Sequence, residues 1–91
     1  MLIKNIYDYL DNISAFSTQE KWDNSGLIVG SMDEEFAEVY ISLDLDEEFL
    51  ETVKDNSLII THHPLIFSGI KTMNNDTYST KLLKILIKRD I

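Results

Sequence analysis

The sequence contains no cysteine, one proline and three glycines, and it has 8 basic residues against 16 acidic ones in a length of 91. Without cysteine, disulfide bonds and thiolate metal sites are excluded, so any transition metal must be held by imidazole and carboxylate groups. The formal net charge of −8 opposes attraction to a polyanion. This charge argues against direct binding to DNA or RNA and favours cations in a cleft.

Long apolar runs are also missing. No run is long enough to span a membrane, and the residues after Met1 lack the apolar segment of a signal peptide. We therefore expect a cytoplasmic protein that does not associate with membranes. With 44% hydrophobic residues, the chain has the size of one compact domain, which buries a smaller share of its surface than a longer chain would. We expect residues 1–91 to form a single, truncated α/β domain.

Three segments predict elements that flank the centre of the chain. Apolar residues between Leu2 and Ile13 recur at the spacing that gives a helix one buried stripe. The apolar run at residues 26–30 is bracketed by glycines, which is typical of a strand between turns, so we expect a short additional strand there. Near the end of the chain, Thr77 or Ser79 is placed to cap a last helix whose basic residues gather toward its C-terminus.

The central segments predict a βαβ unit. Residues 39–43 are rich in β-forming side chains and end at Asp44, after which the acidic residues 46–48 open a helical pattern. Residues 58–61 form an unbroken apolar run, typical of a parallel strand covered on both faces. The expected fold class is therefore α/β, with a βαβ unit, flanking helices and the short additional strand.

The two histidines of the chain, His62 and His63, are adjacent and follow this predicted strand. An extended backbone sends consecutive side chains to opposite faces, so the two imidazoles suit two closely spaced metal ions better than one. Pro64 biases His63 toward an extended conformation, as at the end of a strand. Asp44 ends the neighbouring strand, and ligands bind beyond the carboxyl ends of parallel strands. The pattern predicts a dinuclear metal centre; alternatively, Asp44 starts a turn and the histidines satisfy backbone groups.

Asp23 and Asn24 follow Trp22 in a polar segment that admits two interpretations. Either their polar groups face the metal cleft, or Trp22 anchors the loop on the core while Asp23 and Asn24 make a turn. Their ordinary turn chemistry favours the turn. The sequence contains no glycine-rich phosphate loop and no nucleophile elbow, so any catalysis would depend on metal.

Several motifs together resemble the NIF-three-like family, whose members are also named GTP cyclohydrolase 1 type 2 homologues. The motifs are Trp22-Asp23-Asn24, Gly26-Leu27, Gly30, the segment from Val39 to Asp44, Thr61-His62-His63-Pro64-Leu65-Ile66-Phe67, Gly69 and Lys71. The resemblance spans essentially the whole chain. It implies an α/β fold, a toroidal homohexamer, and two divalent metal ions per full-length subunit. In this arrangement His62 binds one of the two metal ions and His63 binds the other. Zn, Fe, Mn and Ni all suit such ligands.

The resemblance also implies that the chain is the N-terminal portion of such a protein. The family completes its site with a downstream aspartate, a histidine and a glutamate, and none of these has a counterpart here. We therefore expect an incomplete metal site and an inactive fragment, with Asp44 as a partner of the ligands. For the complete protein two functions stay open. One is a metal-dependent hydrolase acting on a small molecule or nucleotide such as GTP; the other is a non-catalytic, metal-binding adaptor or regulatory protein acting through an oligomer.

Overall fold

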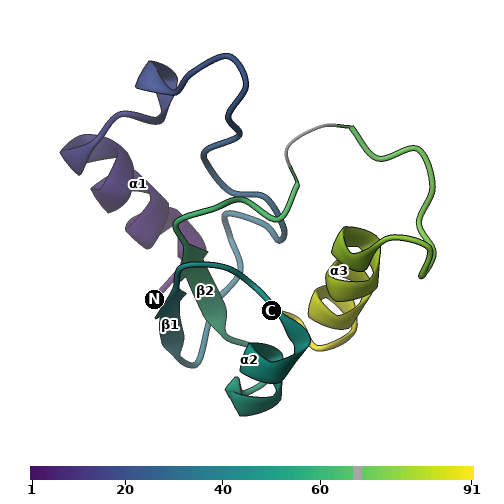
Figure 1. The fold of residues 1–91 in the computed structure, drawn as a ribbon. Coiled ribbons are helices and arrows are strands. Elements are labelled where there is room, and N and C mark those ends of the chain that lie inside the picture. Colours follow the sequence, from purple (N-terminus) through teal and green to yellow (C-terminus); the bar gives the residue numbers. More distant parts are fainter. Residues whose placement is uncertain (67–68) are drawn as a thin grey trace.

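A computed structural model gives the chain a mixed α/β fold and describes residues 1–66 and 69–91 (Figure 1). The elements follow in the order α1 (Ile3–Ile13), the 3-10 turn η1 (Phe16–Thr18), β1 (Val39–Ser42), α2 (Glu47–Thr52), β2 (Leu58–Thr61) and α3 (Tyr78–Lys88). The predicted α/β class is confirmed. Phe67, part of the motif that follows the histidines, lies outside the described residues.

The βαβ unit forms as the sequence predicts. β1 and β2 pair in parallel, with Val39 opposite Leu58 and Ser42 opposite Thr61, and α2 makes the crossover between them (Figure 1). The four residues of β2 are each half-buried, whereas exposed and half-buried residues alternate along β1. The apolar run of β2 is therefore partly covered on both faces rather than enclosed.

Two side chains begin the helices where the sequence indicates. The carboxylate of Asp46 accepts a hydrogen bond of 2.7 Å from the backbone N–H of Phe49 and caps α2. Thr77, rather than Ser79, caps α3, because its hydroxyl oxygen accepts from the backbone N–H of Thr80 at 3.2 Å. Each bond satisfies one of the N–H groups that a helix leaves unpaired at its start.

The buried core lies between α2 and α3 and against the sheet. Leu50 of α2 and Leu82 and Leu86 of α3 are 5% exposed or less. Leu45 and Ile59 pack against this cluster while remaining partly exposed. Full burial of a leucine side chain contributes about 1.5–3 kcal/mol, so this small cluster supplies a large part of the stability.

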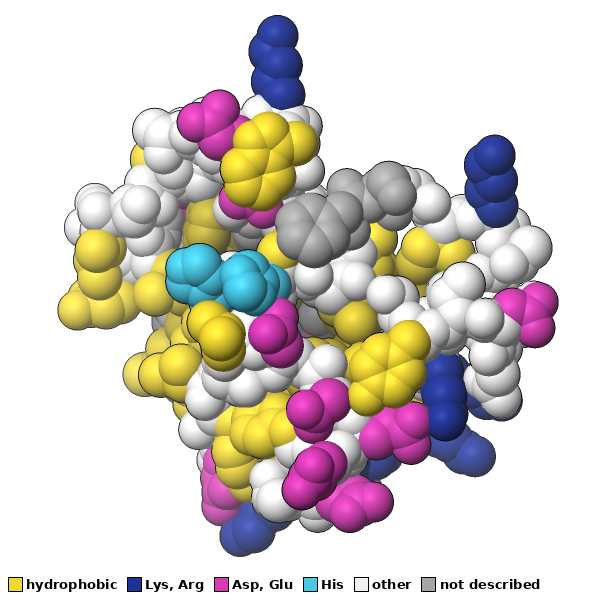
Figure 2. Space-filling view, viewed as in Figure 1, with side chains coloured by type: hydrophobic (Ala, Val, Ile, Leu, Met, Phe, Trp, Pro, Cys, Tyr) yellow, Lys and Arg dark blue, Asp and Glu magenta, His cyan; other side chains and the backbone are white. Residues whose placement is uncertain are grey.

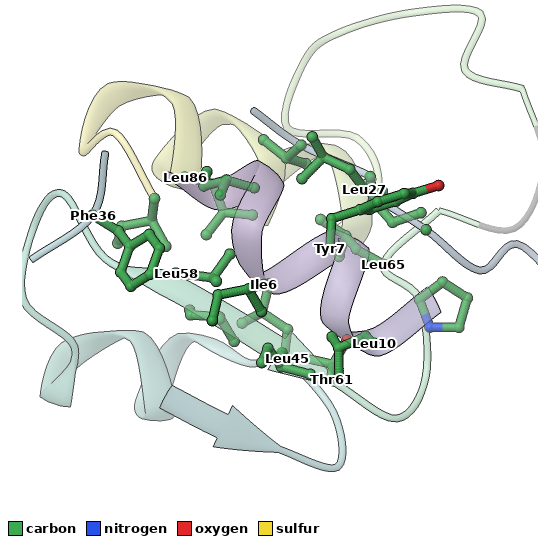
Figure 3. A pocket seen from close by; sticks show the side chains of 18 of the residues that line it. Ile6, Tyr7, Leu10, Leu27, Phe36, Leu45, Leu58, Thr61, Leu65 and Leu86 are labelled. Atoms are coloured by element: carbon green, nitrogen blue, oxygen red, sulfur yellow. The ribbon is translucent and has the colours of Figure 1, made fainter. Parts of the chain in front are cut away.

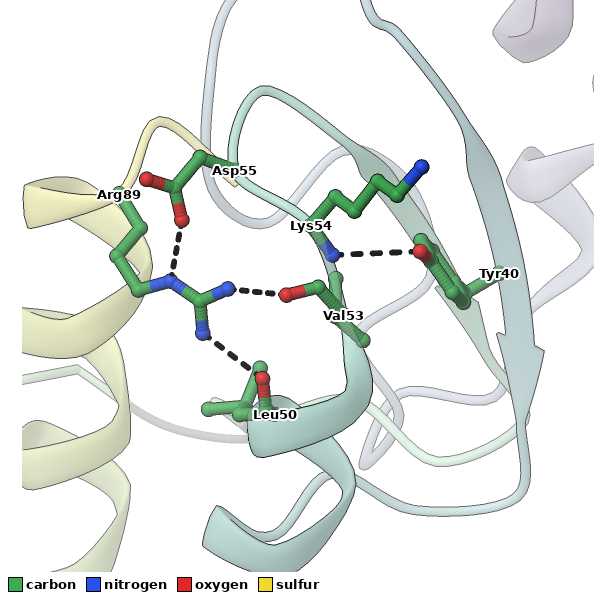
Figure 4. A network of polar contacts seen from close by, with 6 residues as sticks. All are labelled: Tyr40, Leu50, Val53, Lys54, Asp55 and Arg89. Carbon is green, nitrogen blue, oxygen red and sulfur yellow. Dashed lines mark hydrogen bonds and ion pairs between the residues drawn. The ribbon is translucent and has the colours of Figure 1, made fainter.

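Arg89 joins the end of α3 to the segment that follows α2 (Figure 4). Its guanidinium donates to the carbonyl oxygen of Leu50 at 2.8 Å, to the carbonyl oxygen of Val53, and to the carboxylate of Asp55 at 2.6 Å. The last carbonyls of a helix lack the partners that the helix interior provides, and here the guanidinium supplies a donor to Val53 and a second donor to Leu50, whose carbonyl also accepts from the N–H of Val53 at 3.2 Å. The connection that leads into β2 is therefore held in place by α3.

The short additional strand expected at residues 26–30 does not form, and this prediction is wrong. The segment is irregular, and its bracketing residues Gly26 and Gly30 have φ values of +131° and +110°. These conformations, which glycine adopts most readily, turn the chain instead of extending it. The residues between the glycines are apolar because they line a cavity beside α1, not because they pair in a sheet.

One face of β1 carries exposed apolar side chains. Val39, Ile41 and Leu43 are 42%, 78% and 61% exposed, and we refer to these three residues as the β1 strip. Within the described part of the chain, β1 pairs with β2 alone. None of the helices in residues 1–66 and 69–91 combines the length and the apolar character that crossing a membrane requires.

Candidate metal centre

The two histidines lie where β2 ends, beside the end of β1. The parallel ladder continues past both strands, because the backbone N–H of His62 donates to the carbonyl of Ser42 at 3.2 Å. The next N–H, that of His63, also donates toward the β1 side, to the carbonyl of Leu43 at 3.1 Å, so the alternation of the parallel ladder ends at this residue. The ring centroids of the two imidazoles are 4.9 Å apart and their planes meet at 86°. Figure 2 shows both imidazoles together on one exposed face of the molecule.

Asp44 joins this edge from the end of β1. Its Oδ1 lies 2.7 Å from Nδ1 of His63, so the structure brings these two predicted site residues together. The hydroxyls of Ser42 and Thr61 donate to the carbonyls of Asp44 and His63, at 2.6 and 2.7 Å. The turn after each strand is thus closed by a hydrogen bond from the hydroxyl of the strand's last residue. The imidazole of His63 pairs with a carboxylate and not with a backbone group.

The loop that contains Asp23 and Asn24 is joined to the segment after the histidines by a hydrogen bond from Asn24. The carboxylate of Asp23 accepts from the backbone N–H of Asn24 at 2.8 Å, which is the local turn chemistry that the sequence favours. The side-chain amide of Asn24 donates to the carbonyl of Ile66 at 2.6 Å. Trp22 is 70% exposed and does not anchor the loop on the core. The bond from Asn24 joins the loop instead to the segment after the histidines, 42 residues further along the sequence.

The donors fit a metal in kind but not in number. Imidazole nitrogen is a ligand that Zn, Fe, Mn and Ni all accept. Among residues 1–66 and 69–91, however, no group of three histidine, cysteine or acidic side chains is placed to hold one ion. Protein sites generally use three or four protein ligands. His62 and His63 therefore supply only part of a site.

A cavity of about 230 Å³ extends from this edge between α1 and β2 (Figure 3). Its walls are mainly apolar and include Ile6, Tyr7 and Leu10 of α1, with His62 and Asn24 among the polar groups of its lining. No lysine or arginine occurs among the described lining residues. This cavity could not be predicted from the sequence, because its walls come from segments far apart along the chain.

The resolved pKa shifts belong to ion pairs around β1 and α2. The hydrogen bond from the Tyr40 hydroxyl, followed by the Lys54 ammonium, lowers the pKa of Glu38. The same carboxylate raises the pKa of Lys54, and Glu47 raises that of Lys81. All these groups lie at the surface, so they adjust the charges of the scaffold rather than the chemistry of the site.

Fold and site together define an α/β protein that gathers imidazole and carboxylate groups at the carboxyl edge of a parallel strand pair. The sequence model of the Duf34/NIF3 (NGG1p interacting factor 3) family matches residues 1–91, and the chain belongs to this family. The resemblance seen in the Trp-Asp-Asn and His-His-Pro motifs is thereby confirmed.

Curated relatives and solved structures agree with this assignment. A Campylobacter jejuni protein named GTP cyclohydrolase 1 type 2 homolog is 47% identical over 91 residues, covering 100% of this chain and 38% of the relative. A Helicobacter pylori protein named GTP cyclohydrolase 1 type 2 is 44% identical over 90 residues, covering 99% and 37%. The chain thus spans less than 40% of the length of these relatives.

Two crystal structures have the same fold over the whole chain. A Staphylococcus aureus protein matches with a TM-score of 0.83 and 35% identity, covering 100% of this chain and 30% of that protein. A Bacillus cereus protein related to NIF3 matches with a TM-score of 0.81 and 27% identity, covering 100% and 26%. Both proteins are therefore similar to this chain in fold over only part of their own length.

Proposed function

We propose that the chain contributes His62 and His63 as ligands to a dinuclear centre of divalent metal ions, completed by groups outside residues 1–91. The observation that supports this proposal is the position of both imidazoles at the carboxyl edge of the parallel strands, with centroids 4.9 Å apart and planes at 86°. Paired metal ions in hydrolytic sites lie about 3.5–4 Å apart, so neighbouring imidazoles of this kind suit one ion each.

We extend the proposal to metal-dependent hydrolysis for the protein at the length of its relatives. A pair of divalent ions, when bound, polarises the substrate and lowers the pKa of bound water. The role of this chain is to hold the ligands on a rigid strand end and to present an apolar wall beside His62. Asn24 fixes the loop that borders this wall. With two imidazoles and no third ligand among the described residues, residues 1–91 alone are expected to be inactive.

The substrate class follows only from the relatives' names, which refer to GTP. The described cavity lining holds no lysine or arginine for a triphosphate. A nucleotide would therefore have to place its phosphates on the metals or on groups outside this chain, and its base against the apolar wall. Any small molecule with a flat apolar part meets the same wall.

A second function is favoured by the exposed surface. Val39, Ile41 and Leu43 of the β1 strip follow one another at every second position and are 42%, 78% and 61% exposed, and exposed apolar patches commonly mark protein contacts. On this observation the full-length protein acts as a non-catalytic, metal-binding adaptor or regulatory protein within a homo-oligomer, with a hexamer as the proposed assembly.

Metal analysis tests the shared premise of both functions. Bound Zn, Fe, Mn and Ni are measured in two forms of the protein: residues 1–91, and a longer form with the length of the relatives. Each form is compared with its His62→Ala and His63→Ala variants and with the control Glu51→Ala, which lies on the exposed face of α2. We expect two ions per long subunit, loss of one with each histidine variant, and no change with the control. A long form that binds no stoichiometric metal would refute the proposal.

A hydrolysis screen then separates the two functions. The metal-loaded long form is incubated with nucleotides, and phosphate release and ring opening are followed. Turnover that depends on metal and disappears with His63→Ala supports the hydrolase. Full metal loading without turnover on any nucleotide supports the adaptor.

A further inference from the structure

The carboxylate of Asp44 contacts one of the two imidazoles, and the contact selects a protonation pattern. Oδ1 of Asp44 lies 2.7 Å from Nδ1 of His63. An ionised carboxylate can only accept hydrogen bonds, so a contact of this length requires the hydrogen on Nδ1. In a neutral imidazole the lone pair is then left on Nε2. His63 is therefore held as the tautomer that binds a cation through Nε2.

The strand register holds both ends of this contact. Ser42 lies opposite Thr61, and Asp44 and His63 each follow two residues later. The hydroxyls of Ser42 and Thr61 donate to the carbonyls of Asp44 and His63, which fixes both turns. The side chains of Asp44 and His63 remain 62% and 49% exposed. Because an exposed ion pair adds little to folding stability, stability alone does not account for this arrangement.

We propose that Asp44 is a positioning residue that fixes the tautomer and ring orientation of His63, so that His63 offers Nε2 to a divalent metal ion. The inference rests on the proposed metal binding by this edge. Carboxylates that bond the second nitrogen of a metal-binding histidine orient the ring, and their loss typically weakens metal binding 10- to 100-fold. Within the described residues no such bond is found to the ring of His62, which therefore serves as an internal reference.

Imidazole ¹⁵N spectra of the metal-free chain at mildly alkaline pH test the positioning directly. We expect His63 to be mainly the Nδ1–H tautomer and His62 to keep the preference of a free imidazole. In the Asp44→Ala variant, His63 should show the same tautomer ratio as His62. In Asp44→Asn the ratio should lie between those of the wild type and Asp44→Ala, because an amide oxygen still accepts from Nδ1–H. Glu48→Ala, which removes an exposed carboxylate of α2, should change neither ring. An Nε2–H tautomer at His63, or no response to Asp44→Ala, would overturn the proposal.

Zinc titration tests the consequence for metal. The same variants are titrated to millimolar zinc, because two imidazoles bind weakly, and far-ultraviolet circular dichroism checks their folds. We expect a 10- to 100-fold loss of affinity at His63 for Asp44→Ala, a smaller loss for Asp44→Asn, and little change for Glu48→Ala. Equal losses for Asp44→Ala and Glu48→Ala would refute positioning, since removal of any nearby charge would then suffice. The same titration on the protein at the length of its relatives decides the proposed function, which fails if that form binds no zinc; the tautomer spectra decide the role of Asp44 in either case.

Discussion

Replacing Arg89 with alanine should destabilise the fold more than any other substitution of a polar side chain at the surface. The guanidinium donates to the carbonyls of Leu50 and Val53 and to the carboxylate of Asp55. Its own side chain is 27% exposed, so water replaces these donors only in part after truncation. We assign about 1 kcal/mol to each carbonyl bond and up to about 1 kcal/mol to the exposed pair with Asp55.

The sum, about 2–3 kcal/mol, is a large share of the ~5–15 kcal/mol by which small domains are stable. For a domain of this size it corresponds to a fall in Tm of roughly 8–24 °C. Arg89→Lys keeps the charge but loses the planar fork, so it should lose about half as much. Lys88→Ala is the matched control, because Lys88 is exposed one residue earlier, and its effect should stay within about 0.5 kcal/mol.

Urea unfolding followed by circular dichroism measures these differences. The order of stability should be wild type and Lys88→Ala first, then Arg89→Lys, then Arg89→Ala. If Arg89→Ala lies within about 1 kcal/mol of Lys88→Ala, the three hydrogen bonds do not hold the end of α3 to the α2–β2 connection, and the reasoning fails.

Leu82→Ala should lower the free energy of unfolding by about 2–5 kcal/mol, because Leu82 is 1% exposed. Ile87→Ala should lower it far less, because Ile87 is 59% exposed on the same helix. Equal losses of stability in thermal unfolding would contradict the assigned core. The lowered pKa of Glu38 means that its hydrogen bond from Tyr40 stabilises the fold above the ordinary value of 4.5 and that this contribution is lost as pH falls through the lowered value. Glu38→Gln should therefore flatten the acid side of the stability profile, and an unchanged profile would argue against the pairing. The β1 strip, and the edge of β1 that pairs with no other strand in the described part of the chain, should make the chain self-associate, and Ile41→Lys should reduce this self-association. Light scattering that shows a monomer for the wild type at high concentration would refute this prediction.

The parts of the fold that the sequence predicts are the parts that local chemistry determines. The helical stripe from Leu2 to Ile13, the β-rich run after Val39 and the cap at Thr77 each depend on residues a few positions apart. The strand expected at residues 26–30 fails because an apolar run fits a cavity wall as well as a strand. A cavity wall and a strand differ here in the conformations of Gly26 and Gly30, and these conformations depend on the packed structure.

The candidate site divides in the same way. Adjacent histidines after one strand and Asp44 after its parallel neighbour predict that all three meet, because carboxyl ends of parallel strands share one edge. The bond between Asn24 and Ile66 joins residues 42 positions apart and has no local signal. The contact of Arg89 with the carbonyls of Leu50 and Val53, at the C-terminal end of α2, cannot be seen in the sequence either, since a carbonyl has no sequence signature.

The register of β1 and β2 links these distant contacts to the chemistry of the site. Asp44 and His63 meet because each lies two residues past the pair of Ser42 and Thr61. A slip of one residue would place Asp44 beside a neighbour of His63 and send the imidazoles to the opposite faces. At the other end of the strands, the backbone N–H of Asn56 donates to the carbonyl of Arg89 at 3.1 Å. The carbonyl of Asn56 accepts from the N–H of Ala37, just before β1, at 2.7 Å. The end of α3 therefore fixes where β2 begins, and through the register it fixes which imidazole the carboxylate reaches.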